Sequence, residues 1–349
     1  MKTASRLFLI LLCCLFLSRS ALQAQQRTFR ICELNAENLF DTTHDPGKED
    51  REFLPEGNRR WTQNKLWKKL DNLSREIISL GPNRPADIIA LTEVENDSVM
   101  TLLCRRAMLR KAGYRYIITD SPDPRGIDVA LMYQPATFKP LKTASIRIQH
   151  PKQPHFRTRD ILHVAGRLQN GDTLHLFLCH LSSQRGGRSS QRHRAIECQH
   201  LRRSVDTLLC DNPRAKIIII GDFNDTPSSA SLTQHLGAIP LAGKAVKPRC
   251  ASLYNLLPAH AGANVVTGTY KYQGRWQMLD QCIVSGSLLD TAGRVYTSPT
   301  DLHIWAPPFL LEEDSDDLQQ TPRRTYNGYR YNGGFSDHLP IFIDLTVRF

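Results

Sequence analysis

The sequence predicts a layered α/β fold in which sheets pack face to face and helices cover them. Two observations lead to this prediction. Strands and helices interleave along the chain, and several strands are apolar enough to be covered on both faces. The clearest strand is Ile217–Ile220, whose four β-branched residues run into Gly221 and the polar side chains that follow it. No linker, internal repeat or low-complexity tract divides the chain, which favours one domain.

The elements in chain order support this prediction. Apolar residues spaced three and four apart predict an amphipathic helix from Trp61 to Ile78, and a second helix is predicted from Ser98 to Ala112. The segments Tyr114–Ile118 and Ile127–Tyr133 are predicted to be adjacent strands. A long basic helix from Ser189 to Leu209 then precedes the isoleucine strand, as a crossover helix should.

The N-terminus has the layout of a secretory signal peptide. Lys2 and Arg6 form a basic start, an apolar stretch follows, and small residues lie near the end of the segment 1–24. We therefore expect residues 25–349 to be exported as a single domain, either to the periplasm or to the extracellular space.

We do not expect a membrane or lipid anchor on the exported chain. A lipidated cysteine needs a small residue before it, but Leu12 precedes Cys13 and Cys13 precedes Cys14. After the leader, no stretch approaches the length of a membrane-spanning helix.

Charge and cysteine content narrow the function classes. The chain has a formal net charge of +11. A basic surface attracts polyanions such as nucleic acid or acidic headgroups, although ordinary solubilising charge is the alternative. The nine cysteines include no Cys-x-x-Cys pair, which argues against a zinc site. Outside the leader they are predicted to be mostly buried thiols, and one or two disulfides stay open for an exported chain.

Polar side chains of a narrow set recur where predicted strands begin or end. A single polar strand end usually makes a cap or a turn. Here, however, six segments place carboxylates, amides or imidazoles at such ends, and these groups bind hard cations and move protons. The residues are Asn35 and Glu37, Glu93, His180, Asp222 and Asn224, Asp280, and Asp337 with His338. The recurrence predicts one assembled site.

These motifs carry a resemblance to a known family. Leu-Asn35-Ala-Glu37-Asn, Leu-Thr-Glu93, Cys-His180-Leu, Gly-Asp222-Phe-Asn224, Leu-Asp280 and Ser-Asp337-His338-Leu-Pro occur in the order found in the endonuclease/exonuclease/phosphatase superfamily. The chain resembles its secreted bacterial branch over nearly all of the sequence after the leader. The resemblance implies a four-layer α/β/β/α sandwich with two packed, mostly antiparallel mixed sheets, similar to pancreatic-type deoxyribonucleases and abasic-site endonucleases.

The resemblance also implies a site for a hard divalent cation, Mg²⁺ or Mn²⁺, which prefers oxygen ligands and keeps several waters. Glu93 is the first expected ligand. Asn35 and Asp337 are expected to complete the shell directly or through water. Glu37 is expected to join them or to hold a second ion.

The expected catalytic groups flank the scissile phosphate. His338 and His180 are the candidate imidazoles, and an imidazole works best there when a carboxylate holds its far nitrogen. The resemblance implies Asp280 as the partner of His338, and we propose Asp128 for His180. Asp222 is expected to polarise the attacking water, and Asn224 to bind the phosphate oxygen or the water. Either Asp222 or His338 is the general base.

The substrate is addressed by basic loops near these motifs. Arg125, and Arg185 with Arg188 after His180, are expected to contact phosphate, with solvated loop charge as the alternative. Arg324 and Tyr326 lie in a segment where bases, sugars or lipid headgroups could pack, with core tyrosines as the alternative. The acidic segment Glu312–Asp317 would repel a nucleic-acid backbone unless it points away.

The leading functional prediction is an exported, metal-dependent endonuclease or exonuclease. The alternative is a phosphatase or a phospholipase C-type phosphodiesterase that acts on inositol phosphates or sphingomyelin-like headgroups. A non-catalytic binding module on the same fold is the second alternative, but no expected catalytic residue is missing. The sequence does not predict the oligomeric state.

Overall fold

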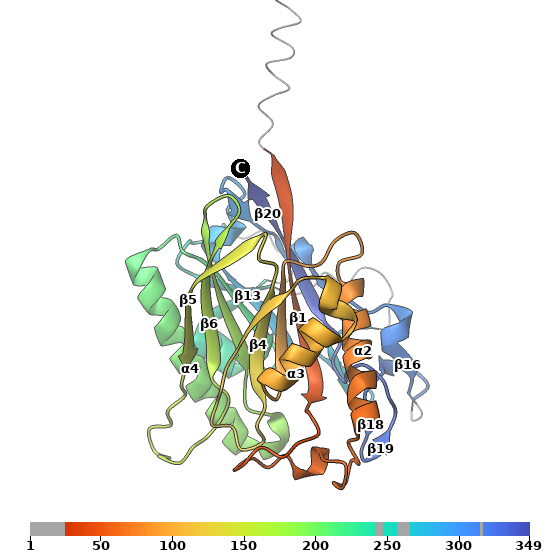
Figure 1. The fold of residues 1–349 in the computed structure, drawn as a ribbon. Coiled ribbons are helices and arrows are strands. Elements are labelled where there is room, and N and C mark those ends of the chain that lie inside the picture. Colours follow the sequence, from red (N-terminus) through yellow and green to blue (C-terminus); the bar gives the residue numbers. More distant parts are fainter. Residues whose placement is uncertain (1–24, 242–246, 257–265, 315–316) are drawn as a thin grey trace, which may run out of the picture.

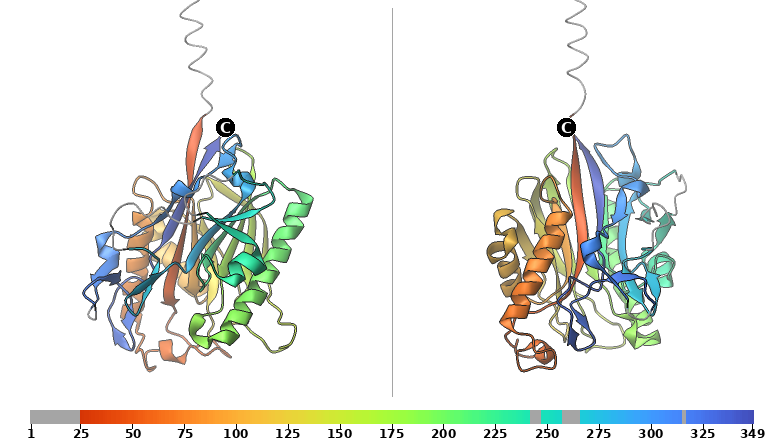
Figure 2. Two further views of the ribbon diagram at one scale, coloured as in Figure 1. Left: turned by 180° about the vertical axis from the view of Figure 1, so that it is seen from behind. Right: turned by 90° about the vertical axis from the view of Figure 1, so that its right-hand side faces the viewer.

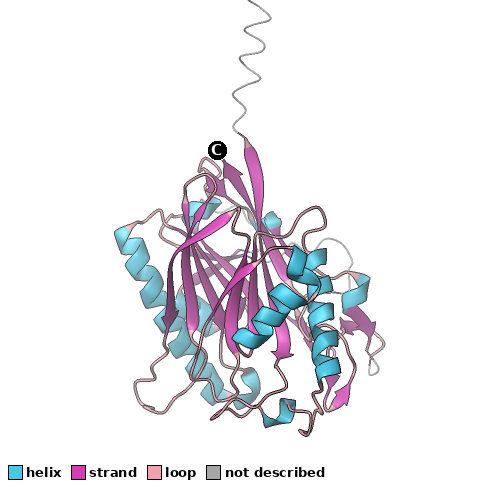
Figure 3. Ribbon diagram, in the orientation of Figure 1, coloured by secondary structure: helices cyan, strands magenta, loops and turns pink. Residues whose placement is uncertain are grey.

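The computed structural model describes residues 25–241, 247–256, 266–314 and 317–349. The predicted signal peptide, residues 1–24, lies outside the described residues. Two large sheets pack face to face, and helices cover their outer faces, so that the layers run α/β/β/α (Figures 1, 2 and 3). This confirms the predicted four-layer architecture.

The first sheet is mixed, with one parallel pair at its centre. Its strands are β14 (Val295–Tyr296), β20 (Ile341–Arg348), β1 (Gln26–Leu39), β2 (Ile88–Val94), β4 (Asp128–Tyr133) and β3 (Arg115–Ile118), in that spatial order, with β15 (Leu302–Ile304) also paired to β20. Only β1 and β2 run parallel among these pairs. The predicted pairing of the two strands around Ile117 and Leu131 is confirmed.

The second sheet repeats this plan. Its order is β5 (Phe138–Ile146), β6 (Ile161–Leu168), β7 (Thr173–His180), β8 (Lys216–Asp222), β13 (Asp280–Ser285), β10 (Leu253–Leu256) and β9 (Ala238–Leu241). The pairs β7–β8 and β9–β10 are parallel and the others antiparallel. Three hairpins lie outside the sheets: β11–β12 (Tyr270–Tyr272 and Arg275–Gln277), β16–β17 (Leu311–Glu313 and Gln320–Pro322) and β18–β19 (Tyr326–Asn327 and Arg330–Tyr331).

The isoleucine strand β8 shows why the sandwich forms. Successive side chains of a strand point to opposite faces. Ile218 and Ile220 therefore join the core between the two sheets, whereas Ile217 and Ile219 join the core beneath α4 (Arg188–Asp211). All four are fully buried, as predicted for a strand covered on both faces.

The helices agree with the sequence except at one segment. The helices α2 (Gln63–Ser79) and α4 lie close to their predicted bounds. The single helix predicted from Ser98 to Ala112 is wrong, because the chain forms α3 (Asp97–Thr101), the π-helix η2 (Leu102–Arg106) and the 3-10 helix η3 (Met108–Lys111). Between the last two, Ala107 is extended, and this break buries Ala107 and Leu109 in the core.

Shorter helices connect the remaining strands. They are η1 (Arg51–Phe53), η4 (Gln184–Gly186), the π-helix η5 (Ser231–Leu236), η6 (Gly286–Leu289), η7 (Pro299–Asp301) and η8 (Pro308–Leu310). Within the described residues, no helix is long and apolar enough to cross a membrane. The seven cysteines found there are free, and five of them are buried.

Candidate active site

The predicted site residues gather at one edge of the sandwich. The strands β7, β8 and β13 lie side by side, and their register places His180, Asp222 and Asp280 next to one another. In the other sheet, the parallel strands β1 and β2 bring Asn35 and Glu93 to the same edge. The chain ends lie at the opposite edge, where Phe349 N donates to the carbonyl of Gln25 (Figure 1).

Gly221 allows two strands to approach closely just before Asp222. Its φ is +145°, and a Cβ atom added there would lie 1.9 Å from the carbonyl oxygen of Cys179 on β7. No side chain fits that space, so the residue before Asp222 must be glycine.

Several residues at this edge have unusual backbone conformations. Glu37, Asn38, Glu93 and Asn224 have φ values of 45°, 59°, 58° and 49°. Left-handed conformations are uncommon for residues other than glycine, and they cluster where a structure holds them for function. The register also shifts in β1 after Asn35 and in β2 around Glu93, as at a β-bulge. These irregularities redirect the polar side chains away from the regular pleat.

His338 and Asp280 form a buried dyad. The Nδ1 atom of His338 lies 2.8 Å from Oδ2 of Asp280. Burial alone would lower the pKa of His338, but Asp280 and Asp222 together raise it well above its usual value. His338 is therefore an imidazolium at neutral pH. Its loop is fixed by Ser336, whose hydroxyl accepts from His338 N and donates to the Asn35 carbonyl.

Asp222 lies between the two imidazoles. Its Oδ2 is 3.9 Å from His338 Nε2 and 3.8 Å from His180 Nε2. The amide of Asn35 donates to Oδ2 at 3.1 Å, and Asn224 donates through its backbone N to Oδ1 at 2.7 Å. Burial raises the pKa of Asp222 to about 7, against the opposing effect of His338. A carboxylate with this pKa can accept a proton near neutral pH.

The side chain of Asn224 is held from one end. Its amide nitrogen donates to the carbonyl of Leu181 and to Oδ2 of Asp222 at 3.1 and 3.3 Å. Both amide hydrogens are used by the protein, so the carbonyl oxygen is the group left for a water hydrogen. Of the two predicted roles for Asn224, this geometry favours binding the water.

His180 is a neutral imidazole. Burial, followed by the charges of Arg159 and Arg125, lowers its pKa well below the usual value. Its Nε2 atom is 3.8 Å from Oε1 of Glu93. Arg159 donates to the backbone carbonyl of His180 at 3.1 Å and so fixes the end of β7.

The predicted pairing of Asp128 with His180 is wrong in this structure. The Asp128 carboxylate instead accepts hydrogen bonds from the Thr119 hydroxyl and from the backbone N of Ser121. Within the described part of the chain, the Nδ1 atom of His180 is buried without a hydrogen-bond partner. Asp128 thus holds the loop after β3, because its nearest donors belong to that loop.

The oxygens predicted to bind a cation are of two kinds. Oε2 of Glu93 accepts from the backbone N of Asn38 at 2.9 Å, whereas Asp337 is half-buried and accepts no hydrogen bond from any described residue. The side-chain oxygen of Asn35 accepts a hydrogen bond from the backbone N of Glu37 at 2.8 Å. Carboxylate oxygens that lack enough protein donors suit a hard divalent cation, so Glu93 and Asp337 fit the predicted metal.

Glu37 has a different environment from the one expected for a free ligand. Its carboxylate accepts from the backbone N of Thr325 at 2.6 Å and lies 3.9 Å from Nζ of Lys69. Burial and the charge of Asp337 raise its pKa to about 7. Protein groups thus already contact both its oxygens, because Oε1 faces Tyr326 N at 3.4 Å.

A further group has metal-ligand spacing. Asp222, Asp280 and His338 offer ligand atoms that all lie within 4.8 Å of one another, and all three are buried. The dyad already uses His338 Nδ1 and one Asp280 oxygen. The partly exposed carboxylates of Glu93 and Asp337 are therefore better cation ligands than the group of Asp222, Asp280 and His338.

The predicted arginines surround this edge. Arg125 donates to the side chain of Asn38 and is close enough to lower the pKa of His180, after the effects of burial and Arg159. Arg185 is exposed on η4, and Arg188 begins α4. None of Arg125, Arg185, Arg188 and Arg324 forms an ion pair with any described carboxylate. Unpaired guanidinium groups beside the catalytic residues suit phosphate oxygens.

Of the two alternatives for Tyr326, a substrate-stacking residue or a core residue, the structure favours the core. Its side chain is 6 % exposed, and its hydroxyl donates to the carbonyl of Arg59 at 2.9 Å. The ring packs against Trp61 and Tyr331. An apolar neighbourhood of rings, which the local sequence does not reveal, places Tyr326 in the core.

Sequence reasoning missed two residues of α2 that hold the catalytic loop. Lys69 is buried and donates to Thr325 Oγ1 at 2.7 Å and to the carbonyl of Phe335. Asn72 donates to the carbonyls of Gly333 and Gly334 at 3.0 and 2.6 Å. The signal was present, because both polar side chains lie on the apolar face of the helix.

Glu33 is the third residue that was missed. It is fully buried on β1, and neither carboxylate oxygen has a hydrogen-bond donor among the described residues. Burial, and then the charge of Asp280, raises its pKa well above the usual value. A neutral Glu33 can donate its proton to Asp280, whose Oδ1 is otherwise unpartnered. A carboxylate inside an apolar strand was the available signal.

Part of the acidic segment is paired with protein groups. Nζ of Lys271 lies 3.4 Å from Asp314 and 2.8 Å from Asp317. Glu312 accepts from the amide of Asn332 at 3.0 Å. These partners reduce the repulsion that the segment would exert on a polyanionic substrate, whereas Glu313 stays exposed.

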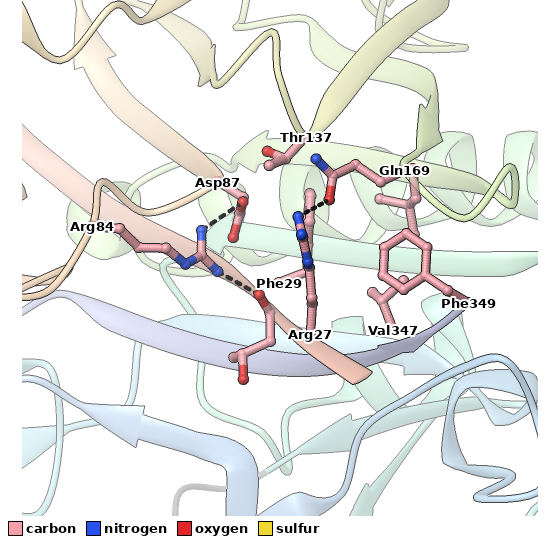
Figure 4. A pocket seen from close by; sticks show the side chains of 10 residues that line it. Arg27, Phe29, Arg84, Asp87, Thr137, Gln169, Val347 and Phe349 are labelled. Atoms are coloured by element: carbon pink, nitrogen blue, oxygen red, sulfur yellow. Dashed lines mark hydrogen bonds and ion pairs between the residues drawn. The ribbon is translucent and has the colours of Figure 1, made fainter. Parts of the chain in front are cut away.

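A cavity of about 400 Å³ lies far from these residues. Figure 4 shows its lining, in which Phe29, Val347 and Phe349 form apolar walls beside Arg27 and Arg84. No residue predicted for the active site lines it. This cavity is therefore not the candidate active site. The candidate residues lie at the strand ends on the other edge of the sandwich.

Comparison with protein families adds an independent observation. Residues 30–347 match the model of the endonuclease/exonuclease/phosphatase family. The chain belongs to this family. Family members hydrolyse phosphate esters with the help of a divalent metal, so the protein is a hydrolase of this class. No curated protein matches the sequence.

Solved structures of this family share the fold. An endonuclease/exonuclease/phosphatase family protein from Bacteroides thetaiotaomicron is 12 % identical, with a TM-score of 0.57 over 93 % of this chain and 100 % of that one. D. rerio TDP2 with 14 humanizing mutations is 17 % identical, with a TM-score of 0.54 over 91 % and 98 %. The human nocturnin catalytic domain with a bound sulfate anion is also 17 % identical, with 0.54 over 93 % and 97 %. At these identities, the likeness concerns the fold.

Proposed function

We propose that this protein is an exported nuclease that hydrolyses phosphodiester bonds of nucleic acid with Mg²⁺ or Mn²⁺. The observation that carries the proposal is the arrangement around Asp222, which has an imidazolium on one side and a neutral imidazole on the other. Arginines without a carboxylate partner lie near this arrangement, and the chain as a whole has a positive net charge. Both observations favour a substrate with several phosphates.

The protein residues divide the chemistry between them. Asp222 takes a proton from the attacking water, which the Asn224 carbonyl orients. His338 already carries its proton, so it donates a hydrogen bond to a phosphate oxygen rather than acting as the base. Asp280 stabilises the positive charge of His338 before the reaction begins. That charge therefore needs no further desolvation as negative charge grows on the phosphate.

The neutral His180 lies where its Nε2 can face either the phosphate or the leaving oxygen. Glu93 and Asp337 would hold the cation, with Asn35 fixing the backbone turn beside them. When bound, a divalent cation supplies positive charge that stabilises the phosphate oxygens and the leaving alkoxide. Arg125, Arg185 and Arg324 bind the neighbouring phosphates.

The test uses the exported chain, residues 25–349, with plasmid DNA, RNA, sphingomyelin and inositol polyphosphates as substrates. Each is assayed with Mg²⁺, with Mn²⁺ and with EDTA. His338→Ala should lower the rate by about 10²–10⁴-fold, and Glu93→Ala should raise the metal concentration needed for activity. His303→Ala and Glu313→Ala, which remove an exposed imidazole and an exposed carboxylate elsewhere, should have little effect.

The outcomes separate the alternatives. Cleavage of plasmid or RNA that EDTA abolishes supports the nuclease. If nucleic acid stays intact while sphingomyelin or an inositol phosphate is hydrolysed, the protein is the phosphatase or phospholipase C-type enzyme instead. If none of the substrates is hydrolysed but one is bound, the fold serves as a binding module.

A further inference from the structure

The hairpin β11–β12 places two tyrosines beside the catalytic histidine. The ring of Tyr270 is 4.9 Å from the imidazole of His338, and the two residues also form an isolated β-bridge. Tyr272 follows on the same face of the strand, because side chains two apart point the same way. The Tyr270 and Tyr272 rings are nearly parallel, with centroids 6.5 Å apart and an angle of 12°.

The exposure of the pair increases away from the dyad. Tyr270 is half-buried against His338, whereas Tyr272 is 54 % exposed. No described residue forms a hydrogen bond with the Tyr272 hydroxyl, and no other described ring covers its free side. The exposed ring of Tyr272, next to the tyrosine that contacts His338, offers a flat apolar face to a substrate.

Lys271 fixes the direction in which these rings point. It lies between the two tyrosines in sequence, so its side chain leaves the opposite face of the strand. There it is fully buried and pairs with Asp314 and Asp317 at 3.4 and 2.8 Å. These ion pairs hold the face of β11 that carries Lys271 against the segment between β16 and β17. Tyr270 and Tyr272 are thereby held on the opposite face, toward the dyad.

Positively charged side chains also act on Tyr270. Burial and the charge of Asp337 raise the pKa of Tyr270, and the nearby guanidinium groups of Arg324 and Arg185 oppose this effect. Both guanidinium groups therefore act electrostatically on the Tyr270 hydroxyl. A substrate that passes over the tyrosines would place an aromatic group on the rings and an anionic group near the arginines, which is the pattern of single-stranded nucleic-acid binding.

We propose that Tyr270 and Tyr272 form a stacking ledge for a nucleobase next to the scissile phosphate, and that the preferred substrate is accordingly single-stranded nucleic acid. This inference rests on the proposed nuclease function. A base that stacks on Tyr272 has left its partner in a duplex, so unpaired strands and frayed ends bind at lower cost than an intact helix. Stacking tolerates any base, because every base has an aromatic face.

The test compares oligonucleotides that differ by one base. A single strand carries an abasic spacer at each position in turn on either side of the cleaved linkage, and the exported chain cleaves it with Mn²⁺ present. At one position the spacer should raise KM for the wild-type enzyme by about tenfold, which corresponds to one stacked base. Tyr272→Ala should raise KM by a similar factor on the intact strand and have no further effect on that spacer strand.

Two variants control for other causes. Tyr272→Phe keeps the ring and should restore the KM of the wild-type enzyme. Phe349→Ala removes an exposed aromatic ring at the opposite edge of the sandwich. It should leave KM unchanged for both the intact strand and the spacer strand. Because Tyr272 is exposed, its alanine variant should show the same unfolding midpoint as the wild type.

The outcomes distinguish this inference from the proposed function. If the wild-type enzyme cleaves nucleic acid but every spacer strand is cleaved like the intact strand, the ledge is wrong and the nuclease stands. Equal losses for Tyr272→Ala on intact and spacer strands, or faster cleavage of duplex than of single strand, would also overturn the ledge. If the wild-type enzyme cleaves neither strand, the nuclease proposal itself fails.

Discussion

The Nδ1 atom of His338 lies 2.8 Å from Oδ2 of Asp280, in a site where both side chains are buried. A charge-assisted hydrogen bond of this length fixes the orientation of the imidazolium ring. The pair is more than a local contact, because Asp280 begins β13 and His338 lies just before β20. The dyad therefore joins the two sheets across the catalytic edge.

Replacing Asp280 by asparagine should leave the fold in place and lower kcat by about 10²–10⁴-fold. The amide keeps the shape but removes the charge that supports the His338 imidazolium, so the pKa of His338 should fall. The change is measured by the NMR titration of His338 alongside steady-state rates. A variant with an unchanged titration and unchanged kcat would show that the dyad does not matter to the reaction. Asp290→Asn, at an exposed ion pair with Arg214, serves as the control.

Glu33→Gln should stabilise the protein increasingly as pH rises. Burial raises the pKa of Glu33 in the folded chain well above its value in the unfolded chain, so folding keeps a proton that the unfolded state releases. The stability that this carboxyl contributes is complete below the unfolded pKa of about 4.3 and declines as pH rises toward the folded pKa. Glutamine has no such dependence.

Urea unfolding at pH 5 and pH 8 checks this prediction. The difference in unfolding free energy between Glu33→Gln and the wild type should be at least about 1 kcal/mol larger at pH 8. Parallel pH profiles for the two proteins would mean that Glu33 is ionised in the fold. Activity at neutral pH should change little, since glutamine can also donate a hydrogen bond to Asp280.

Local patterns in the sequence predicted a layered α/β fold and the gathering of polar strand ends at one site, and the family resemblance implied the four layers. The isoleucines of β8 require cover on both faces, and the polar residues that follow each strand meet because neighbouring strand ends meet. Side-chain partners are a different matter. Asp128 binds its own loop and Tyr326 is in the core, and these contacts depend on segments far apart in the chain.

The irregular parts of the site were beyond sequence reasoning for a related reason. Glu93 adopts a left-handed conformation that its residue type does not favour, and Asn224 adopts one that asparagine tolerates, so the local sequence indicates neither. Glu33 in an apolar strand and Lys69 on the apolar face of a helix indicated burial, but the sequence did not indicate their partners. Those partners become visible only when β1 is covered by the second sheet and α2 by the loop around Phe335.

Gly221→Ala should prevent normal folding of the catalytic edge, whereas Gly171→Ala should not. Both glycines have positive φ, but only at Gly221 would the new Cβ meet a backbone atom, 1.9 Å away. Gly171 has open space around it, so its variant should lose only about 1 kcal/mol from backbone strain. Thermal unfolding of both variants separates the clash from the strain. A Gly221→Ala protein as stable as Gly171→Ala would show that β7 and β8 can move apart.

Lys69→Met should lower the unfolding free energy by about 3–5 kcal/mol, because it leaves the buried carboxylate of Glu37 without its cation. The same change makes the metal site more negative, so Mn²⁺ should bind more tightly by isothermal titration calorimetry. Bound metal should then recover part of the lost stability, by an amount that grows with its concentration. Lys68→Met, at the exposed neighbouring position, should change neither quantity. Weaker Mn²⁺ binding in Lys69→Met would mean that the lysine acts chiefly by holding the Asp337 loop in place, rather than by opposing the charge of the cation.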